Sequence, residues 1–208
     1  MANLIAVTEA FKNLAEAESH LNLRHNTDPA FFPEWRDPLP DLSAADRDRL
    51  TLLHHRLQYH RAQGDLLEGA VMLLVASPLL ELAGFYDPPF RLQAETSVEL
   101  SISDGEETLR GRIDALVLRQ DLWVLVIEAK KTTISTRSAL PQALAYLAAN
   151  PHLDRPSFGL LTNGDDVLFL KLTPPPDRQY SLSRAFSLYT VAEEWPTVLQ
   201  ILRAIGQN

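Results

Sequence analysis

The alternation of apolar and polar positions divides the chain into a helical first third and a remainder rich in strands. Apolar residues that recur every three or four positions predict helices, and strict alternation predicts half-buried strands. The expected helices lie at residues 4–23, 43–63, 68 to about 78, 137–150 and 193–205. The expected strands lie at residues 92–102, around Asp114, and at residues 122–127, 157–162, 167–172 and 180–189. Gly64 separates the second helix from the third, which we expect to weaken near Pro78.

Three consecutive strands predict an antiparallel meander in the middle of the chain. Leu92–Ile102 alternates apolar and polar residues, whereas Leu122–Ile127 is apolar throughout and suits a central strand buried on both faces. Asp104-Gly105 and Gln120-Asp121 are expected to form the turns between the strands. The flanking segments complete the order helix, three-strand meander, helix, strand. This order predicts an α/β fold with a mixed central sheet flanked by helices.

A proline-rich segment at residues 25–42 interrupts the helical first third. Its three aromatic residues, Phe31, Phe32 and Trp35, would either pack this irregular segment onto the body of the protein or stack nucleic-acid bases. We favour packing. The following Ser43-Ala-Ala-Asp46 resembles a capping box and predicts the start of the next helix.

Length and composition are those of an ordinary globular protein. The chain has 208 residues, of which 46% are hydrophobic and 22% are charged. We predict a helical N-terminal extension at residues 1–63 and the main domain at residues 64–208. The chain has no cysteine, and its first residues lack a basic region followed by a long apolar run. We therefore expect a cytoplasmic protein without disulfides or a secretory signal, and without a membrane span, because the longest apolar stretch, residues 69–80, is too short.

The sequence GRIDALVLRQDLWVLVIEAKK, residues 111–131, contains three charged residues in positions that favour a functional site. Asp114 interrupts an apolar strand pattern, and Glu128 and Lys130 end the next strand with side chains on the same face. Charges beside a core are costly unless they are compensated, and a divalent cation shared by both carboxylates would compensate them. Strands often end in charged residues simply because they reach the surface. The lone acid within a strand, Asp114, shifts the balance toward a site.

An Asp on one strand followed by Glu-x-Lys at the end of the next resembles the PD-(D/E)xK nuclease superfamily. The nearest likeness is to the N-terminal nuclease domain of type I restriction enzyme R (motor) subunits, in which a Gln-x-x-x-Tyr motif follows on the next helix. Gln142 and Tyr146 match that motif on one helical face. Glu68 stands where the superfamily has an acid on the helix before the sheet, and Ile113 replaces the usual Pro. The resemblance covers roughly residues 65–172 and implies a restriction-endonuclease-like core.

The resemblance implies metal-dependent hydrolysis of phosphodiester bonds in DNA, with Mg²⁺ as the cofactor and Mn²⁺ as a substitute. Asp114 and Glu128 would hold the metal, with the Ala129 backbone carbonyl as a further oxygen ligand. Lys130 would orient the attacking water or neutralise charge on the phosphorus. A salt bridge from Lys130 to a neighbouring carboxylate, without any substrate, is the alternative explanation.

The candidate residues on the helices leave alternatives open. Glu68 would supply a third carboxylate, as a ligand or behind the ligands, but an acid that faces solvent is an equally good explanation. Gln142 would position the substrate or a ligand. Tyr146 would touch the sugar-phosphate backbone, or it would belong to the core, since it lies within the apolar sequence LAYLA.

The formal net charge of −8 is unfavourable for a DNA-binding protein that acts alone, because phosphates are bound by Lys and Arg. It suits an alternative function, a catalytically inactive module on a nuclease fold that binds nucleic acid or a protein partner. RNA is a second substrate class that the same residues would accept. The sequence has no glycine-rich phosphate loop, so we expect a partner subunit to supply a motor or specificity. A homodimer would suit symmetric cleavage of two strands.

Overall fold

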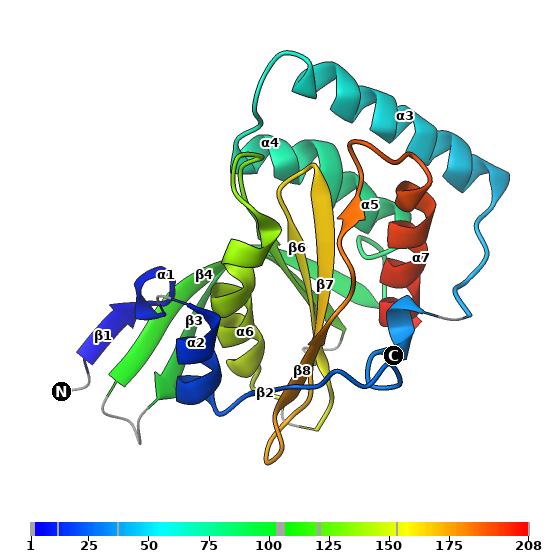
Figure 1. Ribbon diagram of the computed structural model, residues 1–208. Coiled ribbons are helices and arrows are strands. Elements are labelled where there is room, and N and C mark those ends of the chain that lie inside the picture. The colour runs from blue at the N-terminus through cyan, green and yellow to red at the C-terminus, as the bar shows by residue number, and fades with distance from the viewer. Residues whose placement is uncertain are drawn as a thin grey trace.

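One mixed sheet forms the centre of the protein (Figure 1). The computed structural model describes residues 3–11, 13–36, 38–102, 107–119, 122–152 and 154–207. The strands in these residues are β1 (Asn3–Ala6), β2 (Arg24–His25), β3 (Phe90–Ile102), β4 (Glu107–Arg119), β5 (Leu122–Ala129), β6 (Ser157–Thr162), β7 (Asp166–Leu172), β8 (Gln179–Leu182) and β9 (Phe186–Ser187). Their order is β1-β4-β5-β6-β7-β8-β2, with β3 paired to β4 and β9 paired to β7.

Helices cover both faces of this sheet and enclose two hydrophobic cores (Figure 1). One face carries α1 (Val7–Ala10), α2 (Leu14–Leu21) and α6 (Leu140–Ala148), which follows the 3-10 helix η4 (Thr136–Ala139). The other face carries η1 (Pro33–Trp35), α3 (Ala44–Arg61), α4 (Glu68–Val71), the π-helical η2 (Met72–Ala76), α5 (Ser77–Leu82) and α7 (Glu194–Gln207). None of the helices in the described part of the chain has the length and hydrophobicity needed to cross a membrane.

The predicted meander is confirmed. β3 pairs antiparallel with β4 from Phe90↔Arg119 to Ile102↔Glu107, with an interruption at Glu95. β5 pairs antiparallel with β4 and parallel with β6, so α6 forms the crossover between β5 and β6. The order helix, three-strand meander, helix, strand is that of a restriction-endonuclease-like core, with the mixed sheet between layers of helices. The predicted turns Asp104-Gly105 and Gln120-Asp121 lie outside the described residues.

The sheet forks along one edge of β4. The first residues of β4 pair with β1, and this pairing ends at Ala6↔Arg110. The last residues of β4 pair with β5, and that pairing begins at Ala115↔Ile127. Residues 111–114 lie between these two partners and pair with neither of them. At the fork, the backbone groups of this short stretch of β4 are therefore free to bind partners other than a neighbouring strand.

The N-terminal segment differs from its prediction. The helix expected at residues 4–23 is instead β1, α1 and α2, and β1 adds a parallel strand to β4. The Asn13 side chain accepts a hydrogen bond from the Glu16 backbone N–H at 3.0 Å, which starts α2 at a new N-cap. β2 also pairs with β8, so the extension is not purely helical. The boundary predicted between residues 63 and 64 stays a prediction.

Two other elements depart from expectation. The helix that begins at Glu68 changes to the π-helical η2 just before Pro78, as the expected weakening predicts. It nevertheless continues to Leu82, because this proline occupies the first turn of α5, where a missing N–H is tolerated. The strand expected at residues 180–189 is divided into β8 and β9. Between them the Ser183 hydroxyl accepts a hydrogen bond from the Phe169 backbone N–H at 2.9 Å, which replaces a backbone partner in the ladder.

The proline-rich segment packs on the sheet, as favoured from its aromatic residues. Phe32 is only 1% exposed, and its ring centroid lies 6.0 Å from that of Phe158. Glu34 in the same segment accepts a hydrogen bond from the Lys171 ammonium at 2.7 Å. Both side chains of this ion pair are largely buried. These contacts attach the segment to the body of the protein.

Candidate active site

The predicted acidic residues of β4 and β5 meet at the fork in the sheet. Beyond the pair Ala115↔Ile127 the two strands diverge, and the Asp114 carboxylate occupies the space between them. Its Oδ2 accepts a hydrogen bond from the Ala129 backbone N–H at 2.7 Å. The carboxylate therefore replaces the backbone partner that Ala129 loses where the ladder ends.

Glu128 carries a buried carboxylate with an unsatisfied oxygen. The residue is 2% exposed, and its Oε1 accepts a hydrogen bond from the Lys130 ammonium at 2.6 Å. Its Oε2 is one of two buried side-chain polar atoms in the described residues that have no hydrogen-bond partner. Burial and the negative charge of Asp114 raise the pKa of Glu128 to about 7, against the opposing effect of Lys130. Such a carboxylate is poised to gain a cation or a proton.

The neighbouring charges respond to the same environment. Burial raises the pKa of Asp114, although the hydrogen bond from Ala129 and the charge of Lys130 oppose this. Burial alone would lower the pKa of the Lys130 ammonium, but the charge of Glu128 and its hydrogen bond raise that pKa above the ordinary value. Lys130 remains charged at neutral pH and its side chain is 18% exposed, so it can also reach a substrate.

Glu68 lies close enough to act on this cluster through its charge. It is exposed at the start of α4, and its negative charge contributes to the raised pKa values of Asp114, Glu128 and Lys130. The acid predicted on the preceding helix therefore acts on the two strands through its charge.

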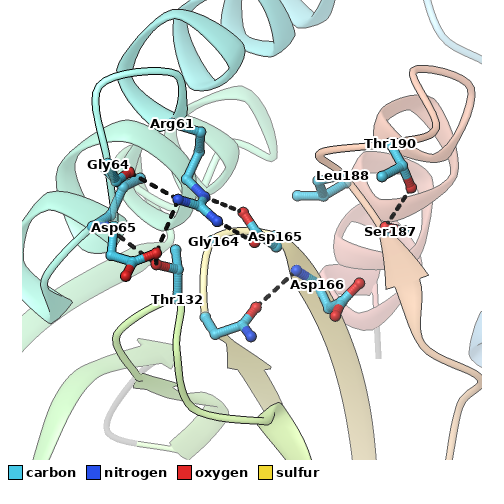
Figure 2. A network of polar contacts seen from close by, with 12 residues as sticks. Arg61, Gly64, Asp65, Thr132, Gly164, Asp165, Asp166, Ser187, Leu188 and Thr190 are labelled. Carbon is cyan, nitrogen blue, oxygen red and sulfur yellow. Dashed lines mark hydrogen bonds and ion pairs between the residues drawn. The ribbon is translucent and has the colours of Figure 1, made fainter.

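A network of satisfied polar groups holds the segment before Glu68 against the strand ends (Figure 2). Leu66 and Thr132 exchange two hydrogen bonds, from the Thr132 N–H to the Leu66 carbonyl and from the Leu66 N–H to the Thr132 Oγ1, each at 3.1 Å. The Arg61 guanidinium binds both carboxylate oxygens of Asp165, at 2.8 and 3.0 Å. It also donates to the Gly64 carbonyl at 2.8 Å and to Asp65 at 3.2 Å. We call Arg61, Asp65, Thr132 and Asp165 the Arg61 network.

Gln142 and Tyr146 interact with each other on α6 and reach the fork from the other side. The Gln142 amide donates to the Tyr146 hydroxyl at 2.9 Å, and this hydroxyl donates to the Arg112 carbonyl at 3.1 Å. Arg112 lies on the part of β4 that pairs with neither β1 nor β5, so Tyr146 satisfies a backbone group at the fork. The ring itself is buried in the core, which supports one of the two alternatives for Tyr146, and its contact with the sugar-phosphate backbone stays a prediction.

The donor set at the fork fits a hard divalent cation. The described residues contain no group of three or more His, Cys, Asp or Glu side chains that could hold a metal ion. Mg²⁺ usually binds through one or two carboxylates and keeps several waters, so Asp114 and Glu128 provide the side chains it requires. The Ala129 carbonyl points toward β4 as its N–H does, because both backbone groups of one strand residue face the same neighbour. The partnerless Glu128 Oε2 is the observation that favours a cation here.

Comparison with protein families gives one decisive match. The family Type I restriction enzyme R protein N terminus (HSDR_N) matches residues 48–178, more than half of the chain. This chain belongs to that family. The matched region contains every candidate residue at the fork, from Glu68 on α4 to Tyr146 on α6. It leaves out β1, α1 and α2 at one end and α7 at the other.

A solved structure from Vibrio vulnificus YJ016 is also similar. It is a fragment described as an HsdR subunit of a type I restriction enzyme, with 21% sequence identity and a TM-score of 0.40. The similarity covers 54% of this chain and 24% of the other, so just over half of this chain matches about a quarter of that protein fragment. A search of curated proteins gave no match.

Sequence reasoning missed two contributors to this region. Arg112 precedes Asp114 by two residues, and its positive charge lowers the pKa of that carboxyl group. The spacing of two on one strand was the signal that could have indicated it. Thr132 follows Lys130 by two residues and connects the strand end to the segment before Glu68. No local pattern identifies Thr132, because its partner lies 66 residues away.

Proposed function

We propose that this chain is the nuclease domain of a type I restriction enzyme R protein, and that it hydrolyses phosphodiester bonds in DNA with Mg²⁺ or Mn²⁺. The observation that carries the proposal is the pair of carboxylates at the fork, Asp114 and Glu128. Within the described part of the chain, the buried Oε2 of Glu128 lacks a partner, and the Lys130 ammonium lies 2.6 Å from its Oε1. Membership of the family supports it. A cytoplasmic location and partner subunits that supply specificity and a motor belong to the same proposal.

Each residue has a role in this proposal. Asp114, Glu128 and the Ala129 carbonyl would hold the metal, which when bound polarises the phosphate and lowers the pKa of a water ligand. The Lys130 ammonium donates one hydrogen bond to Glu128, and its other protons are available to a phosphate oxygen or to the attacking water. Glu68 adds negative charge that favours cation binding.

Gln142 and Tyr146 act as positioning residues in this proposal. Their hydrogen bonds end at the Arg112 carbonyl, two residues before Asp114, and so they fix the course of β4 where the metal-binding carboxylate leaves it. The second N–H of the Gln142 amide is available to a substrate.

The net charge of −8 favours one alternative function. A catalytically inactive module on the same fold would bind nucleic acid or a protein partner and would need neither turnover nor a high positive charge. The carboxylates of such a module would retain Mg²⁺, so metal binding alone does not distinguish the two functions. Turnover does.

The test is Mg²⁺- and Mn²⁺-dependent cleavage of labelled DNA and RNA at low salt. Asp114→Ala and Lys130→Ala should each reduce cleavage by at least about a thousandfold while circular dichroism shows an intact fold. Asp48→Ala, which removes an exposed acid of α3, is the matched control and should cleave like the wild type. Cleavage that persists in both site variants would contradict the proposal. A wild-type protein that binds nucleic acid but never cleaves it would support the inactive module.

A further inference from the structure

A pocket opens at the fork beside the candidate active site. Its polar walls come from Thr8 after β1, Ser97 on β3, Arg110 and Arg112 on β4, and Gln142 and Tyr146 on α6. Arg112 precedes Asp114 by two residues on β4 and its positive charge acts on that carboxyl group, so the pocket and the candidate metal ligand share one strand. Its Thr8 side lies outside residues 48–178, so the N-terminal segment completes a wall that the family match leaves out.

Among the described residues, each of the two arginines has one ion pair, and both ion pairs are exposed. Arg110 Nε lies 3.2 Å from Glu99, and Arg112 Nη1 lies 3.5 Å from Glu95. All four side chains are more than half exposed, and ion pairs of this kind contribute little to stability. A guanidinium has several N–H donors, so each arginine can add a phosphate or exchange its carboxylate for one.

The spacing of these arginines suits a nucleic-acid backbone. Two residues apart on one strand, Arg110 and Arg112 leave the same face of β4 roughly 6.6 Å apart. This is close to the separation of neighbouring phosphates along a single strand. Glu95 and Glu99 place carboxylates on the same guanidinium groups, in positions where phosphate oxygens would replace them.

Gly111 packs closely against neighbouring side chains at this pocket, with no room for a larger residue. A Cβ atom on Gly111, between the two arginines, would lie 2.5 Å from the Tyr146 ring and 3.0 Å from Val7. The Tyr146 hydroxyl also binds the Arg112 carbonyl at 3.1 Å. Tyr146 thus fixes the backbone that carries both arginines, and the pocket keeps its shape without a ligand.

We propose that this pocket binds the phosphate backbone of a DNA strand as it leaves the active site, with Arg110 and Arg112 on neighbouring phosphates. This proposal rests on the proposed function, because it assumes that the DNA strand passes Asp114. Arg110 and Arg112 supply the guanidinium groups for this contact. Each has to exchange its glutamate for a phosphate, because the ion pairs with Glu99 and Glu95 leave the four side chains without net charge.

Binding is measured without turnover, by fluorescence anisotropy of a labelled single-stranded DNA in EDTA and in Ca²⁺, with duplex DNA and RNA as further arms. Arg110→Gln combined with Arg112→Gln should weaken binding about tenfold or more and reduce the slope of log affinity against log salt by about 0.7 per arginine. Arg56→Gln, an exposed arginine of α3, is the matched control and should change neither quantity. Stronger binding of RNA than of DNA would overturn the DNA assignment.

A second pair of substitutions has the opposite expected sign. Glu95→Gln combined with Glu99→Gln frees both guanidinium groups and should strengthen DNA binding several-fold. Affinities of the arginine and glutamate variants that equal those of the Arg56→Gln control would overturn the proposal, as would a wild type that binds none of the nucleic acids at low salt. Asp114→Ala separates the two proposals, since it should abolish cleavage and leave binding in the pocket intact. If the wild type binds DNA through the arginines but does not cleave it, the binding proposal stands and the nuclease proposal fails.

Discussion

The Arg61 network and the candidate active site both lie near the ends of β5 and β6. They differ in how many hydrogen bonds their carboxylates receive. In the Arg61 network, Asp165 receives two hydrogen bonds from one guanidinium, and Asp65 receives one from Arg61 and one from Thr132 at 3.3 Å (Figure 2). Two residues before Thr132, the Lys130 ammonium binds one oxygen of Glu128, and the other oxygen, Oε2, has no partner among the residues that the structure describes.

The difference distinguishes a structural network from a site. Native proteins satisfy almost all buried polar groups, because an unsatisfied one costs about 1–3 kcal/mol. The Arg61 network follows this rule at Asp165, whose side chain is 22% exposed, whereas Asp65 is mostly exposed to solvent. The network fastens the segment before α4 to the strand ends. Among the described residues Glu128 departs from the rule, because its buried Oε2 lacks a partner, and burial raises the pKa of the same carboxyl group. We therefore expect the two groups to respond differently to pH, to a cation and to substitution.

The largest expected difference is a pH dependence of stability that arises at Glu128. Its pKa rises from 4.5 to about 7 on folding, so between these values the folded protein binds more protons than the unfolded chain. The free energy of unfolding should therefore fall as the pH rises from about 4.5 to 7, by about 3 kcal/mol in total, since one pKa unit equals about 1.36 kcal/mol. Urea unfolding in EDTA at several pH values measures this slope.

Glu128→Gln should remove this slope, whereas the exposed Glu81→Gln on α5 should retain it. Excess Mg²⁺ at pH 8 should stabilise the wild type and have little effect on Glu128→Gln, because the cation needs the carboxylate. Equal slopes for the wild type and Glu128→Gln would show that this carboxylate is as well satisfied as those of the Arg61 network, and the comparison would fail.

A smaller effect on stability is expected in the Arg61 network. Arg61→Met leaves Asp165 and Asp65 without the guanidinium and should lower the free energy of unfolding by about 2 kcal/mol. Urea unfolding measures the loss, with Arg56→Gln on the exposed face of α3 as the control. The slope assigned to Glu128 should persist in Arg61→Met. Its disappearance would mean that the network and the site form one electrostatic unit.

Most of the core fold could be predicted because its patterns are local. The alternation at residues 92–102, the apolar run at residues 122–127 and the capping box at Ser43 and Asp46 each encode one element, and the structure contains all three. β1 could not be predicted in the same way. Its residues were assigned to a helix because the strand forms only through pairing with β4, about 100 residues later in the chain, whose edge requires a partner.

The candidate site divides along the same line. Sequence spacing was sufficient to predict that four residues lie near one another, because the side chains of neighbouring strands and of the following helix converge. These residues are Asp114, Glu128, Lys130 and Tyr146. The orphaned oxygen of Glu128 and the fork at residues 111–114 depend on where two ladders end, and this is set by packing across the whole sheet. Sequence spacing carries no information about such an end point.

The smallest effect tests a satisfied hydrogen bond within the site itself. Tyr146→Phe keeps the buried ring but removes the hydroxyl that binds the Arg112 carbonyl and accepts from Gln142, so the free energy of unfolding should fall by about 1 kcal/mol. Because this hydroxyl resembles the Arg61 network in being satisfied, the pH slope of Glu128 should remain, as urea unfolding at pH 5 and pH 8 can show. Gln142→Ala is the matched variant, since it removes one of the two hydrogen bonds and should cost less. If Tyr146→Phe loses the pH dependence of the free energy of unfolding, the Tyr146 hydroxyl and the Glu128 carboxylate act as one group, which the cation stabilises.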